Sequence, residues 1–158
     1  MTNTEPTSGE PPKAPEEGAT QVVTAFLLRR DRDRDEILLV RRSGRVRTYQ
    51  GRWAGVSGYL EPGVTPLEQV YTEIREETGI EREAIDLRRS GQPMLVRDPA
   101  ASLVWLVHPF LFEVKTPERI RIDWEATEMR WVAPPDIAGL DTVPGLAEAF
   151  ARVYASAA

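Results

Sequence analysis

Residues 58–80 read GYLEPGVTPLEQVYTEIREETGI, and this stretch decides the fold because it joins a glycine-bearing loop to an amphipathic helix. Thr65 is suited to cap the helix, and Pro66 suits its first turn, where a missing N–H leaves no hydrogen bond unmade. Glu68 lies three residues after Thr65 and can complete a capping box. Gly79 is typical of the residue that ends a helix. The pattern therefore predicts a helix between Thr65 and Gly79.

One face of this predicted helix is apolar, and an adjoining arc is acidic. At about 100° per residue, the carboxylates Glu73, Glu76 and Glu77 share one arc beside the apolar stripe. Like charges one turn apart destabilise a helix by a few tenths of a kcal/mol unless something neutralises them. A hard divalent cation such as Mg²⁺ or Mn²⁺ would do so, and Mg²⁺ is commonly bound by carboxylates together with substrate phosphates. From the helix alone, the alternative is a solvated acidic face, with Arg75 offsetting part of the charge.

Apolar and β-branched runs on both sides of this segment predict strands. The first two are expected at 21–28 and 37–40, with the charged residues 29–36 as a hairpin loop. The strongest later strand is 103–114, in which His108-Pro109 is expected to mark a bulge or bend. Further strands are expected at 53–60, 87–96 and 128–132, and a second helix at 146–154. The order of strands, helix, strands and helix predicts an α+β fold with a mixed sheet between helices.

The composition narrows the classes of partner and chemistry. With 25 acidic and 20 basic residues, the net charge of −5 disfavours duplex nucleic acid as the main partner. The chain has no cysteine, which excludes disulfides and thiolate zinc sites. No basic-plus-apolar leader and no long apolar run is visible, so we expect a cytoplasmic protein with no membrane partner. Residues 1–20, rich in Pro, Glu and Thr, are expected to be a disordered tail before one domain at 21–158.

Residues 58–80 resemble the Nudix box, whose pattern is G-x5-E-x7-R-E-U-x-E-E-x-G-U, where U is a bulky aliphatic residue. The residues that fit this pattern at the required spacing are Gly58, Glu73, Ile74, Glu76, Glu77, Gly79 and Ile80. Two positions depart from it, because Val64 stands where the family has its first Glu and Thr72 where it has the Arg. In the family these two residues form an ion pair that braces the loop against the helix. Losing both together leaves no single charge stranded.

The resemblance extends over most of residues 21–155 and implies the Nudix fold, an α/β/α sandwich with a mixed sheet between helices. It implies that Glu73, Glu76 and Glu77 bind Mg²⁺ or Mn²⁺, and a backbone carbonyl near Ser57 is a further candidate ligand. It also implies a small-molecule partner of the nucleotide type. A homodimer is compatible with the resemblance, because dimers are frequent in the family.

The expected catalytic set comprises two acids of the helix, Glu76 and Glu77, and two later acids, Glu125 and Glu128. Hydrolysis needs a base that takes a proton from the attacking water. Some relatives carry an additional metal-binding or basic Glu just ahead of the strand that contains Trp131. We therefore expect Glu125 and Glu128 to act there as a pair, and the alternative is that they are exposed loop acids.

Substrate contacts are expected from three places in the chain. Arginine side chains suit phosphate oxygens through two parallel hydrogen bonds, although those at strand ends can also be simply solvated. A tryptophan beside the loop acids can stack on a nucleobase, although tryptophan is often a core residue. The candidates are Arg41 and Arg42 at the end of a strand, Ser57 and Gly58 in the loop before the helix, and Trp124.

These features predict Mg²⁺- or Mn²⁺-dependent hydrolysis of a phosphoanhydride bond in a nucleoside diphosphate linked to another moiety. A nucleoside triphosphate, an oxidised nucleotide and a nucleotide sugar are such compounds. A second class, a Nudix-fold module that binds a nucleotide or metabolite without turnover, is permitted by Val64 and Thr72. A third, a domain that mediates only protein contacts, is disfavoured because the three helix acids are retained. Turnover separates the first class from the second.

Overall fold

A computed structural model of the protein describes residues 18–154. Residues 1–17, which make up most of the predicted tail, and residues 155–158 lie outside this description. The strands are β1 (Thr20–Asp31), β2 (Arg34–Arg42), β3 (Trp53–Ala54), β4 (Val56–Tyr59), β5 (Ile85–Ser90), β6 (Met94–Asp98), β7 (Leu103–Val114) and β8 (Ala126–Val132). The α-helices are α1 (Pro66–Thr78) and α2 (Leu146–Val153), and 3₁₀ turns lie at Arg82–Ala84, Pro99–Ala101, Pro117–Arg119 and Pro134–Gly139. Within residues 18–154, no helix has the length and apolar character needed to cross a membrane.

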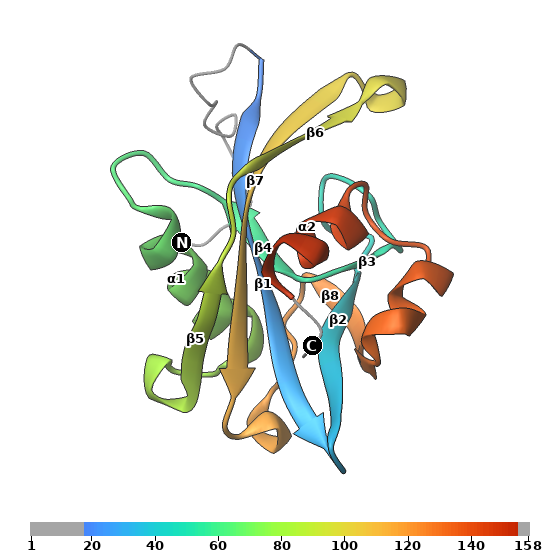
Figure 1. Ribbon diagram of the computed structural model, residues 1–158. Helices are drawn as coiled ribbons and strands as arrows, with labels where there is room; N and C mark the ends of the chain where they lie inside the picture. Colours follow the sequence, from blue (N-terminus) through green and yellow to red (C-terminus); the bar gives the residue numbers. More distant parts are fainter. Residues whose placement is uncertain (1–17, 155–158) are drawn as a thin grey trace.

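The strands form one mixed sheet, shown in Figure 1. Its central path runs β3-β2-β1-β7-β5, while β4 pairs with β1, β6 with β7 and β8 with β2. Strands β1 and β7 are parallel, and the other pairs are antiparallel. Strand β1 pairs with β4 along its first half and with β2 along its second half. The loop that leads from β4 into α1 therefore starts at the centre of the sheet.

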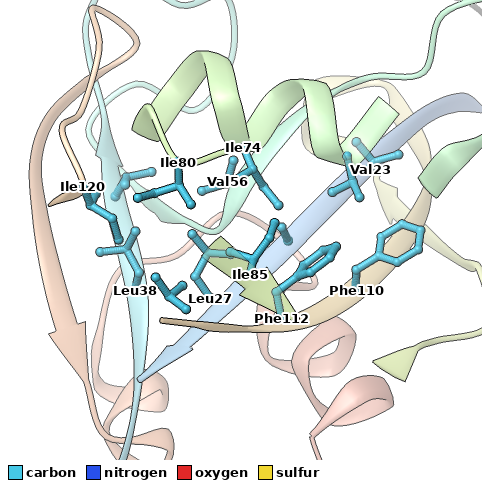
Figure 2. Close-up of a cluster of buried hydrophobic side chains, with 14 of the residues drawn as sticks. Val23, Leu27, Leu38, Val56, Ile74, Ile80, Ile85, Phe110, Phe112 and Ile120 are labelled. Carbon is cyan, nitrogen blue, oxygen red and sulfur yellow. The ribbon is translucent and has the colours of Figure 1, made fainter. Parts of the chain in front are cut away.

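Helices α1 and α2 cover opposite faces of this sheet (Figure 1). Because side chains alternate along a strand, Val23 and Leu27 of β1 face α1, where they share a core with Ile74 (Figure 2). On the other face, Phe26 packs edge-on against Phe150 of α2, with 5.1 Å between the ring centroids. This arrangement confirms the predicted α+β sandwich, in which a mixed sheet lies between helices.

The ends of α1 confirm the predicted capping. The Thr65 hydroxyl accepts a hydrogen bond from the Glu68 N–H at 3.2 Å, and the Glu68 carboxylate accepts one from the Thr65 N–H at 3.4 Å. Pro66 occupies the first turn, and Gly79 ends the helix in the left-handed conformation at φ 77°. Together these caps fix which residues of α1 face the sheet.

The hairpin between β1 and β2 is tighter than the predicted loop at 29–36, which is wrong in its extent. Only Arg32 and Asp33 lie outside the strands, at φ 54° and 66°, as a two-residue hairpin turn of type I′ requires. The charges that suggested a loop instead form cross-strand pairs, such as Arg29 with Glu36 at 2.8 Å. Oppositely charged residues can face each other across exposed strand ends without ending the strands.

The region predicted as one irregular strand at 87–96 consists of two strands, β5 and β6, and both pair with β7. Strand β7 has the predicted bounds. It pairs with β1 through His108-Pro109 without a register shift, so the bulge or bend predicted there is wrong. The register shift lies in β5 instead, between Leu87 and Arg89. Pro109 falls where the partner changes from β6 to β5, and its carbonyl accepts a hydrogen bond from the Gly91 N–H at 2.9 Å.

Candidate functional site

Two of the three predicted helix acids are buried rather than solvated. Glu73 and Glu77 lie one turn apart on α1 and are 7% and 9% exposed, respectively. Glu76 is only half-buried. Burial of an ionised carboxylate is costly unless it is paired with a cation or hydrogen-bonded. The burial pattern thus favours a binding role over a solvated acidic face.

Glu73 is held between its own helix and the backbone of β4. Its Oε2 accepts a hydrogen bond of 2.9 Å from the Gln69 amide, and Glu77 lies one turn further along the same helix. Gly58 faces it from β4, and a Cβ added at Gly58 would overlap the Glu73 carboxyl group. Burial raises the pKa of Glu73 to about 7, although the hydrogen bond from Gln69 opposes this rise. Any side chain at position 58 would therefore displace the Glu73 carboxyl group.

Glu77 has an oxygen without a hydrogen-bond partner. Its Oε2 is fully buried and makes no hydrogen bond. Burial, followed by the charges of Glu125 and Glu73, raises the pKa of Glu77 well above its ordinary value. An oxygen-only, multiply acidic cluster with an unsatisfied buried oxygen is the donor chemistry that Mg²⁺ and Mn²⁺ prefer. The residues therefore fit a hard divalent cation.

Acids from the segment before β8 approach the helix acids. The charge of Glu125 acts on Glu77, and the charge of Glu76 raises the pKa of Asp123, although burial is the larger cause of that rise. The Asp123 carboxylate accepts a hydrogen bond from the Glu125 N–H at 3.0 Å, which fixes the local turn. A backbone hydrogen bond of 2.8 Å from the Ser43 N–H to the Glu125 carbonyl ties the segment to the end of β2. Asp123 is not among the residues predicted from the sequence, where its only signal is its position two residues before Glu125.

Within residues 18–154, no group of three or more acidic or histidine side chains is already arranged as a metal-binding cluster. Glu73 and Glu77 are buried, and burial raises the pKa of both carboxyl groups. Binding a cation would require these carboxyl groups to lose their protons.

Arg42 faces the acidic cluster. Adjacent strand residues point to opposite faces, and Arg42 pairs with Ala126, whose side chain packs in the core beneath α1. Its Nε donates to the Thr48 carbonyl at 2.8 Å, and burial lowers its pKa while the charges of Glu77 and Glu125 oppose this effect. A half-buried guanidinium beside carboxylates is suited to bind the oxygens of a phosphate.

Arg41 and Glu128 lie on the other face of the sheet. They are direct partners across β2 and β8, and Arg41 Nη1 lies 3.4 Å from Glu128 Oε1. Arg41 also donates to the Gly51 carbonyl at 2.9 Å. The two arginines expected together are therefore separated, as are Glu125 and Glu128. Strand alternation separates Arg41 from Arg42, and a register shift in the pairing of β2 with β8 separates Glu128 from Ala126 and the segment before it. A strand predicted to end at Val40 and another predicted to begin at Glu128 contain neither feature.

The remaining predicted contact residues lie apart from one another. The Ser57 hydroxyl lies 3.1 Å from the Thr24 hydroxyl, on the face of the sheet away from α1. Only the backbone of Ser57 is therefore left as a candidate to contribute to the site. Trp124 is 39% exposed, with the Arg45 guanidinium carbon 5.3 Å from its ring centroid. Trp124 lies between Asp123 and Glu125 in the chain and remains a candidate for stacking.

An aromatic cluster that sequence reasoning did not assemble lies next to Arg42. Tyr49 donates to Asp98 at 2.7 Å and accepts from the Trp105 indole at 3.1 Å, while Tyr59 stacks on Trp105 with 6.5 Å between ring centroids. Arg42 donates to the carbonyl and the hydroxyl of Thr48, the residue before Tyr49 in the chain. Arg42 thus stands between the aromatic cluster and the acidic one. No local signal marked Tyr49, because its partners come from distant strands.

Comparisons with known proteins place this geometry in context. A family model described as the NUDIX domain matches residues 19–153. Solved structures with a similar fold include an Ap4A hydrolase binary complex from C. elegans, at 15% identity and TM-score 0.72, covering 85% of this chain and 94% of that chain. A MutT protein from Methanosarcina mazei Go1 is 25% identical with TM-score 0.70, covering 88% of this chain and 95% of that chain.

A third similar structure is the NUDIX domain of Shewanella oneidensis NrtR complexed with ADP ribose. It is 16% identical with TM-score 0.63, and the match covers 95% of this chain and 91% of that chain. All three matches span most of both chains, so the similarity concerns the whole domain rather than one motif.

Proposed function

The chain belongs to the NUDIX domain family, and from that premise we propose that it hydrolyses a nucleoside diphosphate linked to another moiety. The reaction cleaves a phosphoanhydride bond and uses Mg²⁺ or Mn²⁺. One observation carries the proposal: Glu73 is buried against Gly58, Glu77 is buried one turn further along α1, and one Glu77 oxygen makes no hydrogen bond. Two buried acids are costly to a fold unless a cation or hydrogen bonds compensate them.

When bound, a divalent cation would supply positive charge for the phosphate oxygens and would activate a water molecule for attack. Glu73, Glu76 and Glu77 would hold it, since they present the carboxylate oxygens on one arc of α1. Arg42 would bind a phosphate oxygen that faces the acidic cluster, since its guanidinium is already directed there by Thr48. Glu125 is the proposed base, because its charge reaches Glu77 and its backbone is tied to β2. Glu128 is not included, because it lies on the opposite face with Arg41.

The aromatic cluster of Tyr49, Tyr59 and Trp105 supports a nucleoside as one part of the substrate. Aromatic faces stack on nucleobases regardless of the base. Asp98, bound to the Tyr49 hydroxyl, adds an acceptor beside these rings. Structural neighbours named as an Ap4A hydrolase and as a MutT protein, and one complexed with ADP ribose, are consistent with nucleotide-type compounds.

A second candidate is a module that binds a nucleotide without turning it over. Two observations favour it: Val64 and Thr72 replace the ion pair of the Nudix box, and one neighbour is a NUDIX domain complexed with ADP ribose. The two candidates share the same site and differ only in turnover.

The test is nucleotide and phosphate release from a panel of nucleoside triphosphates, oxidised nucleotides, ADP ribose, nucleotide sugars and dinucleoside polyphosphates. Each is incubated with Mg²⁺, with Mn²⁺ and with a chelator. We expect cation-dependent cleavage of at least one compound. Saturable binding of a panel member without cleavage under any condition would favour the binding module and overturn the enzymatic proposal.

Glu125→Gln and Glu128→Gln form a matched pair of variants. We expect Glu125→Gln to lower kcat by roughly 10²-fold or more, the usual contribution of a positioned general base. Glu128→Gln removes the same charge from the opposite face, so its kcat should stay close to that of the wild type. The measurement is steady-state turnover of the substrate found in the panel. Equal losses in the two variants would contradict the assignment of the base.

Divalent cations should stabilise the protein more at high pH than at low pH. Glu73 has a pKa raised from 4.5 to about 7 in the folded state. Below pH 4.5 the Glu73 carboxyl is neutral in both the folded and the unfolded state, so it does not change the free energy of unfolding. As the pH rises toward 7, this carboxyl ionises first in the unfolded state, so the free energy of unfolding falls. In a chelator, the melting temperature should therefore be lower at about pH 8 than at about pH 5 through this group.

At about pH 8, Mg²⁺ at a hundredfold excess over its Kd should raise the melting temperature by roughly 5–10 °C. Thermal melts at the two pH values, with chelator or Mg²⁺, make the measurement. Glu73→Gln is the control, because it removes the titrating group. A Mg²⁺ effect that is equal at both pH values would contradict the prediction.

A further inference from the structure

Gln69 is a buried polar side chain that the reaction itself does not use. The residue is 4% exposed, and both ends of its amide are hydrogen-bonded. Its oxygen accepts from the Glu61 N–H at 3.0 Å, and its nitrogen donates to Glu73 Oε2 at 2.9 Å. One side chain therefore links the loop before α1 to a proposed cation ligand.

The two positions that carry the family's ion pair make no such link in this chain. The Thr72 hydroxyl donates to the Glu68 carbonyl at 3.2 Å, within its own helix. Val64 has an apolar side chain, and its N–H donates to the Glu61 carbonyl at 3.3 Å, within its own loop. Neither Val64 nor Thr72 therefore connects the loop to α1. Gln69, at a different position, makes that connection.

We propose that Gln69 is a positioning residue that replaces the missing ion pair, holding the loop at Glu61 and orienting the Glu73 carboxylate. The proposal rests on the proposed role of Glu73 as a cation ligand. A neutral amide suits this task because it donates to a carboxylate without cancelling the negative charge that a cation needs. Outer partners of metal ligands typically change metal affinity by about 10- to 100-fold when they are removed.

Gln69→Met is the principal variant, because it keeps the side-chain volume and removes both hydrogen bonds. Gln69→Ala is the second variant, and Gln92→Ala, at an exposed loop position, is the control. Thermal melts in chelator confirm that each is folded. The first readout is amide hydrogen exchange at Glu61, and the second is the affinity for Mn²⁺ measured by electron paramagnetic resonance without substrate.

We expect faster exchange at Glu61 and roughly 10- to 100-fold weaker Mn²⁺ binding in both Gln69 variants, with the control unchanged. Adding Val64→Glu and Thr72→Arg together to Gln69→Met should recover Mn²⁺ affinity by rebuilding the ion pair, but not the Glu61 exchange protection. This rescue separates positioning from a general loss of packing.

Unchanged Mn²⁺ affinity in both Gln69 variants, while Glu77→Gln weakens it, would overturn the role of Gln69 and leave the proposed function standing. Failure of the wild type to bind Mn²⁺ would overturn the proposed function and this inference with it. If the Glu61 amide exchanges in both Gln69 variants at the wild-type rate, the proposed link between Gln69 and the loop is overturned, regardless of the Mn²⁺ affinity.

Discussion

Glu77→Gln should lower kcat by between about 10²- and 10⁴-fold while making the cation-free protein no less stable. Glutamine keeps the size of the side chain and loses the charge needed to hold a cation. The Glu77 carboxyl is buried, one of its oxygens makes no hydrogen bond, and its pKa is raised mainly by burial. Removing a buried charge of this kind relieves a folding cost, so the melting temperature in chelator should stay the same or rise.

The measurement combines steady-state kinetics with thermal melts of the same preparations. Glu128→Gln is the matched control, because it removes an acid from the opposite face of the sheet. A large loss of turnover with retained stability would mark Glu77 as a residue kept for function. Wild-type turnover in Glu77→Gln would contradict its role, and a loss explained by unfolding would appear as a lower melting temperature.

Gly58→Ala should abolish most of the activity through a single added methyl group. That carbon would overlap the Glu73 carboxyl group, which is buried and accepts a hydrogen bond from Gln69, so moving it aside would break that bond. Overpacking of this kind typically costs about 1–3 kcal/mol of stability. The displaced carboxylate should also bind Mn²⁺ less tightly, so both turnover and cation affinity should fall.

Gly44→Ala is the control for this substitution. Gly44 has no neighbouring atom within 4 Å of the added carbon and does not have a positive φ. Its activity, Mn²⁺ affinity and melting temperature should match those of the wild type. Full activity in Gly58→Ala would show that Glu73 moves aside without consequence and would remove the argument from close approach.

The parts of the fold that depend on local chemistry could be predicted from the sequence. Helix α1 follows from Thr65, Pro66, Glu68 and Gly79, because capping involves neighbouring residues. Strand β7 has the predicted bounds because its apolar run is long. The hairpin before β2 could not be bounded in this way, since charged residues form strands when a partner strand supplies opposite charges.

The helix acids could be found from spacing, but their burial could not. Spacing placed Glu73 and Glu77 on one arc, whereas the approach of Gly58 and of the segment before β8 depends on tertiary contacts. The separation of Glu125 from Glu128 depends on a register shift between β2 and β8, which the sequence does not mark. Gln69 gave no signal, because a glutamine on an acidic helix is normally exposed.

Mn²⁺ binding tests the central claim most directly, because it needs no knowledge of the substrate. Electron paramagnetic resonance would measure Mn²⁺ affinity for the wild type, Glu77→Gln and Glu128→Gln at a pH above the raised pKa of Glu73, which is about 7. The account predicts that the wild type and Glu128→Gln bind alike, and that Glu77→Gln binds at least about tenfold more weakly. Equal affinity in all three proteins would contradict a cation site on this face of α1.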